Sequence, residues 1–386
     1  MKQRYYRFGI LTCLLLFLLT GNIVAQTNEE NQQTYTKLMK QKNYGDAIRL
    51  MDKVLKDKES KTAENYYKRA AAYAAIDTDH QHYTFSEMLT DLDSIAKRYP
   101  DFVSYELDSA TTLLGHRLPV VTLGNRSARH HIMVQATMHA REYMATQLTM
   151  ALLEHYAQMC YQDICEYKGQ RISNLLQQVC FVIIPMVNPD GVEIAQNGSN
   201  GQLTDEVKQW VRQTEDNGTS HTKIKANANG VDINRNFGNG FNNPFTSSRK
   251  THRSFNFYSG LLPYSEPESQ LMLRVSQRYD YDLFLNYHTS GNIIYYGCQN
   301  AKKYVNKLAH DYAKLIHCHT NYPLYGPDSA PAGGTWADDV EIIYQCPSVT
   351  VELGSTNPVP ISESPTIFEK HKNVWADLAI EVLDNP

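Results

Sequence analysis

The chain has 386 residues, of which 42% are hydrophobic and 20% charged, so it can bury a sizeable core in one large domain plus a small one. Its 37 basic and 41 acidic residues give a net charge of −4 at pH 7, and the basic residues form no stripe. The composition is therefore that of a globular, enzyme-sized protein and gives no basis for nucleic acid as a partner.

Residues 1–25 have the three parts of a secretory signal peptide. Three basic residues stand within the first seven positions, residues 10–20 are almost wholly apolar, and Ala25 supplies a small residue at the expected cleavage site. The apolar stretch is short for a bilayer span, and an uncleaved anchor is the alternative. We expect a secreted or periplasmic protein that has no membrane association after cleavage.

Six cysteines remain once Cys13 leaves with the signal peptide, and an even number in an exported chain permits disulfides. Spacing does not decide their pairing, because six cysteines allow about 15 connectivities. We expect Cys180 to bridge Cys160 or Cys165, since these cysteines flank a helix-to-strand connection. Buried free thiols are the alternative.

Residues 26–79 form a separate region rich in Asn, Gln, Lys and Ala. The periodicity predicts two amphipathic helices, at about 44–55 and 66–76. With Asn43–Ala47, the pair resembles one helical hairpin of a tetratricopeptide repeat. A single unit cannot bury its own apolar face, so we expect it to pack on the main domain or on a partner.

Residues 80–386 show apolar runs that alternate with helical patterns. A helix begins at Thr84 and ends before Pro100. The expected strands are 103–108, 118–123, 132–136, 179–185, 283–287 and 349–353; the later helices are 143–159, 266–278, 302–317 and 365–383. Continuous apolar strands separated by helices indicate an α/β fold with a mixed, mostly parallel twisted sheet covered by helices on both faces.

The polar stretch 137–143 directly follows one of these strands and contains a candidate metal site. His139 and Glu142 are three residues apart, so one turn lets an imidazole and a carboxylate converge on one point. Catalytic zinc takes three such protein ligands and keeps a fourth position for water. The alternative is a pair of unrelated surface groups.

The third ligand must come from elsewhere in the chain. His288 ends the apolar run 283–287, and an open α/β sheet places its ligands at such strand ends. We therefore expect His139, Glu142 and His288 to bind one Zn²⁺ ion.

Two further sites fit the chemistry of a zinc-bound water. Glu352 interrupts an apolar strand, where a carboxylate is unfavourable unless it is functional or paired, and a raised pKa would suit a general base. The alternative is a strand-end acid that faces solvent. Arg235 stands beside Asn234, and an Arg fork can hold a substrate's terminal carboxylate through two hydrogen bonds.

Six short motifs occur in a fixed order between residues 80 and 386. They are His139–Glu142, Val187–Gly191, Gly230–Phe237, Tyr264–Glu268, His288 and Thr350–Glu352. This order resembles the zinc carboxypeptidases of the carboxypeptidase A type. The resemblance implies a mixed-sheet α/β fold, zinc on His139, Glu142 and His288, Glu352 as general base and later proton donor, and Asn234 with Arg235 at the terminal carboxylate.

The sequence departs from that family at two places. Members usually have an Arg that polarises the scissile carbonyl shortly before the Gly-Val-Asp motif; the nearest match is Arg212, at altered spacing, with Lys223 or Lys225 as alternatives. Digestive members also carry a mobile Tyr just ahead of a Gly-Gly pair, whereas residues 328–332 contain none. Tyr325 is the nearest tyrosine that could take the role.

Other stretches resemble a bacterial branch that cleaves γ-D-glutamyl-diamino acid bonds in peptidoglycan stem peptides. They are residues 139–147, 225–230, 288–295 and 354–358. Asp338 lies in the segment that lines the specificity pocket of the family, and a carboxylate there would favour a basic or diamino side chain. An acid at a helix start on the surface is the alternative.

These observations together predict an exported zinc metallocarboxypeptidase that acts on a peptide or a murein peptide. The competing hypothesis is a non-catalytic protein that presents a peptide or cell-wall fragment, with residues 26–79 as its interaction module.

Overall fold

The computed structural model describes residues 30–40, 47, 50–51, 54, 81–162, 166–241, 249–329 and 333–384. The chain divides into two units, residues 1–79 and 80–386. The expected signal peptide and the expected helix at 66–76 lie outside the described residues. In the first unit, residues 30–40 are helical, and Tyr35, Ala47, Met51 and Val54 form a small buried cluster.

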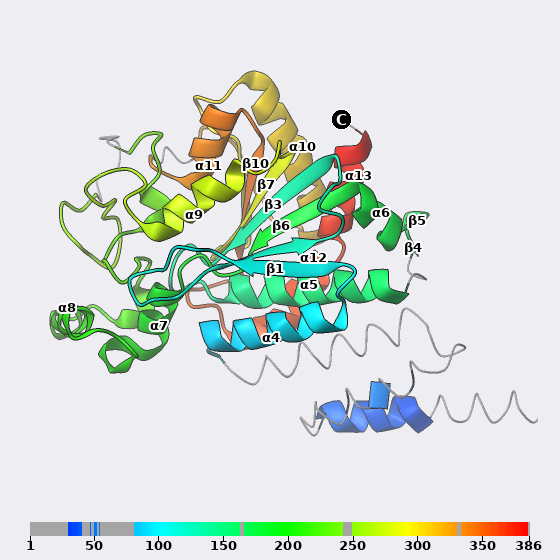
Figure 1. The fold of residues 1–386 in the computed structure, drawn as a ribbon, viewed down its shortest axis with the longest axis horizontal. Coiled ribbons are helices and arrows are strands. Elements are labelled where there is room, and N and C mark those ends of the chain that lie inside the picture. The colour runs from blue at the N-terminus through cyan, green and yellow to red at the C-terminus, as the bar shows by residue number, and fades with distance from the viewer. Residues whose placement is uncertain are drawn as a thin grey trace, which may run out of the picture. The chain divides into compact units, whose positions relative to one another are not determined.

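An eight-stranded mixed sheet forms the centre of the second unit (Figure 1). In spatial order the strands are β1 (Val103–Leu107), β2 (Pro119–Leu123), β6 (Val179–Ile184), β3 (His130–Ala136), β7 (Leu283–Thr289), β10 (Ser348–Leu353), β8 (Ile293–Tyr296) and β9 (Leu324–Tyr325). Strands β6, β3, β7 and β10 run parallel, whereas β2 and β8 pair antiparallel with their neighbours β6 and β10. The predicted mixed, mostly parallel sheet is confirmed.

Ten α-helices are described in this unit, beside short 3-10 and π-helical turns and a small hairpin of β4 (Glu166–Tyr167) and β5 (Gln170–Arg171). They are α4 (Phe85–Arg98), α5 (Met144–Gln162), α6 (Ile172–Gln178), α7 (Pro189–Asn197), α8 (Asp205–Asp216), α9 (Pro267–Ser276), α10 (Lys303–Thr320), α11 (Trp336–Asp339), α12 (Ser364–His371) and α13 (Val374–Asp384). Among the described residues, no helix combines the length and apolar character that a membrane span requires.

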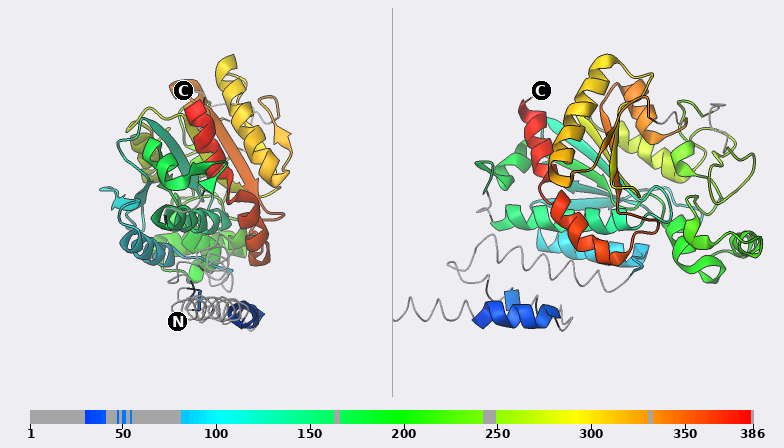
Figure 2. Two further views of the ribbon diagram at one scale, coloured as in Figure 1. Left: turned by 90° about the vertical axis from the view of Figure 1, so that its right-hand side faces the viewer. Right: turned by 180° about the vertical axis from the view of Figure 1, so that it is seen from behind.

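The single helix expected at 365–383 is wrong, because the structure divides this stretch into α12 and α13. Both segments pack on α10, but their other neighbours differ: α12 lies against α5, whereas α13 lies against α6 (Figure 2). A change of direction between residues 371 and 374 allows both contacts. The apolar period continues across the break, so the sequence pattern alone does not reveal it.

Apolar side chains cover both faces of the sheet because successive residues of a strand point to opposite sides. In β6, Val179, Phe181 and Ile183 join one apolar cluster, which includes residues of α4, α5, α10, α12 and α13. Cys180, Val182 and Ile184 join a second cluster, which includes residues of α9 and α11. Helices on both faces were predicted, and this arrangement confirms them.

The expected disulfide of Cys180 is wrong, and the alternation along β6 gives the reason. Cys180 and Cys160 are both buried, and neither forms a disulfide. Cys160 lies on α5 in the first cluster, whereas Cys180 points into the second cluster on the other face. The sheet therefore separates the two thiols. Cys165 lies outside the described residues.

A buried acidic group at the start of α9 leads to a prediction about stability. Glu268 Oε2 accepts a hydrogen bond from Asn227 Nδ2 at 3.2 Å, whereas its Oε1 has no partner among the described residues. Burial raises the pKa of Glu268 well above its usual range, and the charges of Asp190 and Glu266 raise it further. The folded protein therefore holds a proton on Glu268 that the unfolded chain releases above about pH 4.5.

We expect Glu268→Gln to stabilise the protein at pH 8 by about 1–3 kcal/mol in the free energy of unfolding. Folding favours the protonated acid, so the contribution of Glu268 to the free energy of unfolding is complete below its unfolded pKa and is lost as the pH rises. The amide of the variant does not ionise, so the variant does not lose stability in this way. Urea unfolding of wild type and variant at pH 5 and pH 8 measures the difference in free energy of unfolding, and the variant's advantage should be larger at pH 8.

The matched control is Glu266→Gln, because the Glu266 carboxylate accepts hydrogen bonds from Asn227, Asn229 and Ser265 at 2.8 Å each. An amide cannot accept all three, so this variant should be destabilised. Equal stability of Glu268→Gln and wild type at pH 8 would contradict a protonated Glu268.

Candidate metal centre and substrate pocket

The carboxyl ends of three parallel strands bring the predicted site residues to one edge of the sheet. The register of β7 and β10 pairs His288 directly with Glu352. Strand β3 ends at Ala136, beside Tyr287 of β7, and the turn that follows carries His139 and Glu142 before α5 begins. Segments far apart in the sequence therefore meet at the strand ends, as expected for an open α/β sheet.

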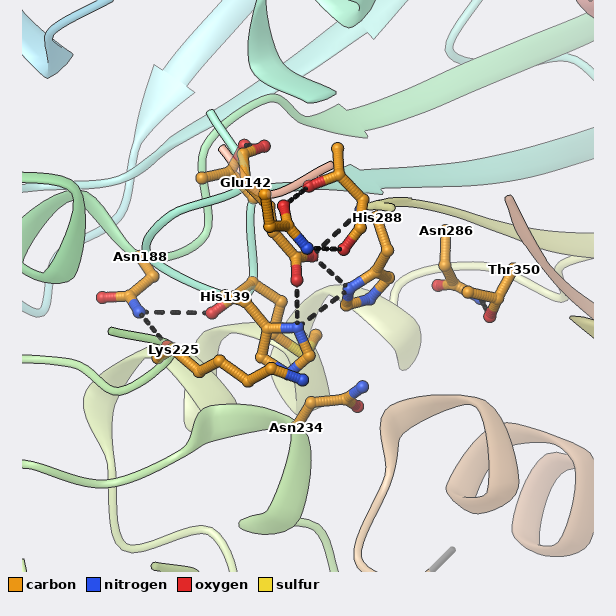
Figure 3. A network of polar contacts seen from close by, with 12 residues as sticks. His139, Glu142, Asn188, Lys225, Asn234, Asn286, His288 and Thr350 are labelled. Carbon is orange, nitrogen blue, oxygen red and sulfur yellow. Dashed lines mark hydrogen bonds and ion pairs between the residues drawn. The ribbon is translucent and has the colours of Figure 1, made fainter. Parts of the chain in front are cut away.

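Glu142 lies between the two imidazoles (Figure 3). Its Oε1 is 2.9 Å from His139 Nδ1 and its Oε2 is 2.9 Å from His288 Nδ1, while the two Nδ1 atoms are 3.3 Å apart. All three side chains are buried, and one ligand atom from each lies within 4.8 Å of the others. Among the described residues, this is the one group of three such side chains placed to hold a metal ion.

The donor set fits zinc. Two imidazole nitrogens and a carboxylate oxygen are ligands that catalytic zinc uses, and three protein ligands leave a position for water. Burial by itself would raise the pKa of Glu142, but the charges and hydrogen bonds of His139 and His288 hold it well below its usual range. The carboxylate is therefore ionised and suited to a cation.

The outer nitrogens of both imidazoles also suit metal binding. His139 Nε2 lies 3.3 Å from Asp232 Oδ1, and neither atom has another hydrogen-bond partner among the described residues. His288 Nε2 lies 3.3 Å from the side-chain amide of Gln135, whose Oε1 is likewise unpartnered. When Nδ1 binds a metal, Nε2 carries the proton, so Asp232 is the natural acceptor for the Nε2 proton of His139.

Asp232 was not anticipated as a functional residue, although it lies two positions before Asn234 in the Gly-Val-Asp motif. Burial would raise its pKa, but the charge and hydrogen bond of His139 hold the pKa far below the usual range. An aspartate between the apolar residues Val231 and Ile233 was the signal in the sequence that could have identified it.

A cavity of about 250 Å³ opens beside the metal-binding group. Five of the predicted site residues line it: His139, Asn234, Arg235, Asp338 and Glu352. The Arg235 Nη1 donates to the Asn234 carbonyl at 2.6 Å, while its Nε has no partner among the described residues. Asn234 Oδ1 accepts from the Trp336 N–H at 3.0 Å, which connects this pair to the start of α11.

Arg212 was expected to polarise the scissile carbonyl, but the structure places it outside the cavity lining. Helix α8 buries Val207, Trp210 and Val211, and Arg212 is exposed on its outer side. The helical period decides this, because the apolar face of α8 must point inward.

Lys225, which the sequence left as an alternative, does line the cavity. Its backbone carbonyl accepts from Ala140 N at 3.1 Å and from Asn188 Nδ2 at 3.3 Å, so it is bound to the turn that carries His139 (Figure 3). Its ammonium lies 5.6 Å from the centre of the Phe257 ring. Tyr325 also lines the cavity, from β9.

The Glu352 carboxyl has the acidity of a base that works near neutral pH. Burial and the charge of Glu142 raise the pKa of Glu352 to about 7, although the charges of His288, Lys225 and Arg141 lower it. Glu341 is a third acid of the cavity beside Asp338 and Glu352, and it was not anticipated from the sequence. Its place three residues after Asp338, on the same side of a helical turn, was the available signal.

Comparisons with known proteins identify the family of this chain. A family model described as zinc carboxypeptidase (Peptidase_M14) matches residues 88–372. The γ-D-glutamyl-L-diamino acid endopeptidase 1 of Lysinibacillus sphaericus is 28% identical over 304 residues, which cover 76% of this chain and 72% of that protein. Human carboxypeptidase B2 is 23% identical over 298 residues, which cover 72% of this chain and 63% of that protein.

Solved structures show the same fold. Thrombin activatable fibrinolysis inhibitor has a TM-score of 0.60 at 18% identity, covering 79% of this chain and 78% of its own. Carboxypeptidase A from Helicoverpa armigera has a TM-score of 0.56 at 20% identity, covering 88% of this chain and 79% of its own.

Fold and site together define a zinc-dependent peptide hydrolase. The chain belongs to the zinc carboxypeptidase family. The resemblance predicted from the six motifs is confirmed, and so is the expectation of an enzyme rather than a non-catalytic binding protein.

Proposed function

We propose that the protein is an exported carboxypeptidase that binds one zinc ion and hydrolyses the peptide bond before a terminal residue with a free carboxylate. The observation that carries this proposal is the shared cavity: a metal ligand, a base and a carboxylate-binding pair, namely His139, Glu352 and Asn234 with Arg235, line the same 250 Å³ space. No part of this set is missing.

Zinc held by His139, Glu142 and His288 supplies a Lewis acid that acidifies water and polarises a carbonyl. Arg235 binds the substrate's terminal carboxylate through its guanidinium, whose Nε has no partner among the described residues, and Asn234 contributes its amide Nδ2. This contact places the last peptide bond beside Glu352.

Glu352 then moves the proton. Its ionised carboxyl takes a proton from the attacking water as the water oxygen bonds to the carbonyl carbon. The same carboxyl passes this proton to the leaving nitrogen as the C–N bond breaks. The products are a shortened peptide with a new carboxylate and a free amino acid.

Lys225 is proposed to hold the scissile carbonyl oxygen. It lines the cavity with His139 and Glu352, and no ion pair joins its ammonium to a carboxylate of the described residues. Its positive charge is also among those that lower the pKa of Glu352 and of Asp232. A cation in this position stabilises the oxygen as negative charge develops.

We expect Lys225→Ala to reduce kcat by about 100- to 1,000-fold, the effect of removing one donor to a developing oxyanion. Steady-state kinetics on a peptide substrate measures this loss. Arg212→Ala is the matched control and should retain wild-type kinetics, because Arg212 is exposed outside the cavity. The reverse result would restore Arg212 to the role predicted from the sequence.

A direct test of the proposed function uses the purified protein, peptides with different terminal residues, and mass spectrometry of the products. We expect release of the terminal amino acid only, loss of activity with a zinc chelator, and recovery when zinc is added. Cleavage inside the peptides, or unchanged activity in the chelator, would reject the proposal.

A second candidate substrate is the bond between a γ-D-glutamyl residue and a diamino acid in a murein peptide. The similarity to the Lysinibacillus sphaericus endopeptidase, at 28% identity over 304 residues, favours it. Assay of a γ-D-glutamyl-diaminopimelate tripeptide beside the standard peptides separates the two candidates.

Export is part of the proposal and has its own test. The basic and apolar segments of residues 1–25 support cleavage after Ala25. Amino-terminal sequencing of the mature protein should then begin at Gln26. Residues 26–79 remain proposed as a hairpin that docks on the main domain or on a partner.

A further inference from the structure

Residues 225–236 form one continuous segment, here called the substrate segment, that carries three of the proposed substrate contacts. Lys225 stands at its start, and Asn234 with Arg235 stands near its end. Figure 3 shows Lys225 and Asn234 beside the metal ligand His139. Apart from one short 3-10 turn, the segment has no regular secondary structure, so its shape depends on the side chains that hold it.

Asn227 shapes the first half of the substrate segment. Its Oδ1 accepts backbone hydrogen bonds from Asn229 and Val231 at 3.1 Å each. Its Nδ2 donates to Glu266 Oε2 at 2.8 Å, and Asn229 Nδ2 donates to the same oxygen at 2.8 Å. One carboxylate oxygen therefore holds the turn that begins two residues after Lys225.

Asn236 ends the substrate segment, immediately after Arg235. Its Nδ2 donates to Ser265 Oγ at 2.9 Å, and Ser265 Oγ donates to Glu266 Oε1 at 2.8 Å. Its Oδ1 accepts from the backbone N–H of Glu266 at 3.2 Å, while its Nδ2 also reaches carbonyls of the loop 259–262. Glu266 therefore holds both ends of the segment, one through Oε2 and the other through Oε1 and its N–H.

Glu266 is itself fixed in position. It is the N-cap residue of α9, and only 5% of its surface is exposed. Helix α9 buries Leu271, Met272 and Val275 in the second apolar cluster, so the start of this helix is anchored to the sheet. A carboxylate on such a rigid element can hold a segment of irregular structure with precision.

We propose that Glu266 is a positioning residue for catalysis, which fixes both ends of the substrate segment and acts on the substrate through Lys225 and Arg235. The inference rests on the proposed function, which assigns the terminal carboxylate to Arg235 and the carbonyl oxygen to Lys225. Glu266 does not line the cavity. It matters because a displacement of about 1 Å in a substrate-binding group can reduce the rate by about 100-fold.

The test compares a peptide that has a free terminal carboxylate with the same peptide as its terminal amide. The ratio of the two kcat/KM values measures how well Arg235 is placed, and it does not depend on the amount of active enzyme. We expect the zinc-loaded wild type to prefer the free acid by at least about 100-fold, and Glu266→Gln to reduce this ratio by at least about tenfold. The amide of the variant has one oxygen, so it can accept hydrogen bonds at one end of the segment and not at both.

Ser265→Ala separates the positioning role from stability. Ser265 is exposed, so its replacement leaves the core and the Glu266 carboxylate in place. We expect KM for the free-acid peptide to rise about 3- to 10-fold while kcat stays within about twofold, because the Arg235 end of the segment is loosened. Ser265→Thr keeps the hydroxyl and should retain the wild-type KM. A residue that contributes to folding alone would change the amount of active enzyme, and so kcat, but not KM.

Glu268→Gln is the matched control for Glu266→Gln. The Glu268 carboxyl also contacts Asn227, at 3.2 Å, but it already carries a proton in the folded protein, so the amide replaces an uncharged group. Its ratio and its KM at pH 7 should stay within about twofold of wild type. Unfolding temperature and zinc content show that each variant is folded and loaded.

Two results would overturn this inference alone: an unchanged ratio in folded, zinc-loaded Glu266→Gln, or an unchanged KM in Ser265→Ala. A wild type that hydrolyses the amide as well as the free acid would instead overturn the proposed role of Arg235, and the proposed function with it.

Discussion

Glu352→Gln is expected to reduce kcat/KM by about 100- to 10,000-fold while zinc content and unfolding temperature stay at wild-type values. The amide has nearly the shape of the carboxyl but cannot accept a proton from water at neutral pH. Glu352 is not part of the metal-binding group, so its replacement leaves all three ligands in place. The loss should appear in the chemical step and not in metal binding.

Metal analysis and turnover must be measured on the same preparation of this variant. Retained turnover near the wild-type rate would reject Glu352 as the base. Loss of zinc together with activity would show a structural role instead. Thr350→Val, on the same face of β10, is a useful companion, because it alters the cavity wall without removing a carboxylate.

His288→Ala is expected to weaken zinc binding by more than about 100-fold and to remove activity. The variant leaves two of the three donor atoms, and it also leaves Glu142 without the imidazole 2.9 Å from its Oε2. Competition with a coloured chelator measures the zinc affinity. His252→Ala, which removes an exposed histidine, is the control and should bind zinc as wild type does.

Asp232→Asn should give a smaller effect than His288→Ala, because Asp232 touches the ligand and not the metal. Loss of such an outer partner lowers metal affinity by about 10- to 100-fold. The graded series of His288→Ala, Asp232→Asn and His252→Ala therefore tests the arrangement around His139. Zinc binding by His288→Ala as tight as that of wild type would contradict the proposed ligand set.

Strands and their ends were accessible from the sequence because they depend on local pattern. A run such as residues 132–136 is apolar at every position except Gln135, and a strand buried on both faces explains that pattern. Polar residues that directly follow such runs, as His139 and His288 do, must lie at the edge of a parallel sheet. Their convergence around Glu142 is the result that the pattern predicted.

Side-chain direction was decided by the tertiary structure. Arg212 and Lys225 are both cations near the Gly-Val-Asp motif, and only the packing of α8 and the hydrogen bonds of Lys225 with Asn188 and Ala140 determine which one enters the cavity. The same holds for Cys160 and Cys180, which flank one connection in sequence but lie on opposite faces of the sheet.

The amino-acid sequence by itself determined the class of fold, the order of the motifs and the residues that meet at the strand ends, because apolar periodicity and chain direction are local properties. The tertiary structure alone decided which cation lines the cavity, how the last helix divides, and that Glu341 lines the cavity. Each of these depends on contacts between segments distant in sequence, such as the backbone hydrogen bonds from Gly297 and Ser348 that fix the Glu341 carboxyl. No local pattern records such contacts.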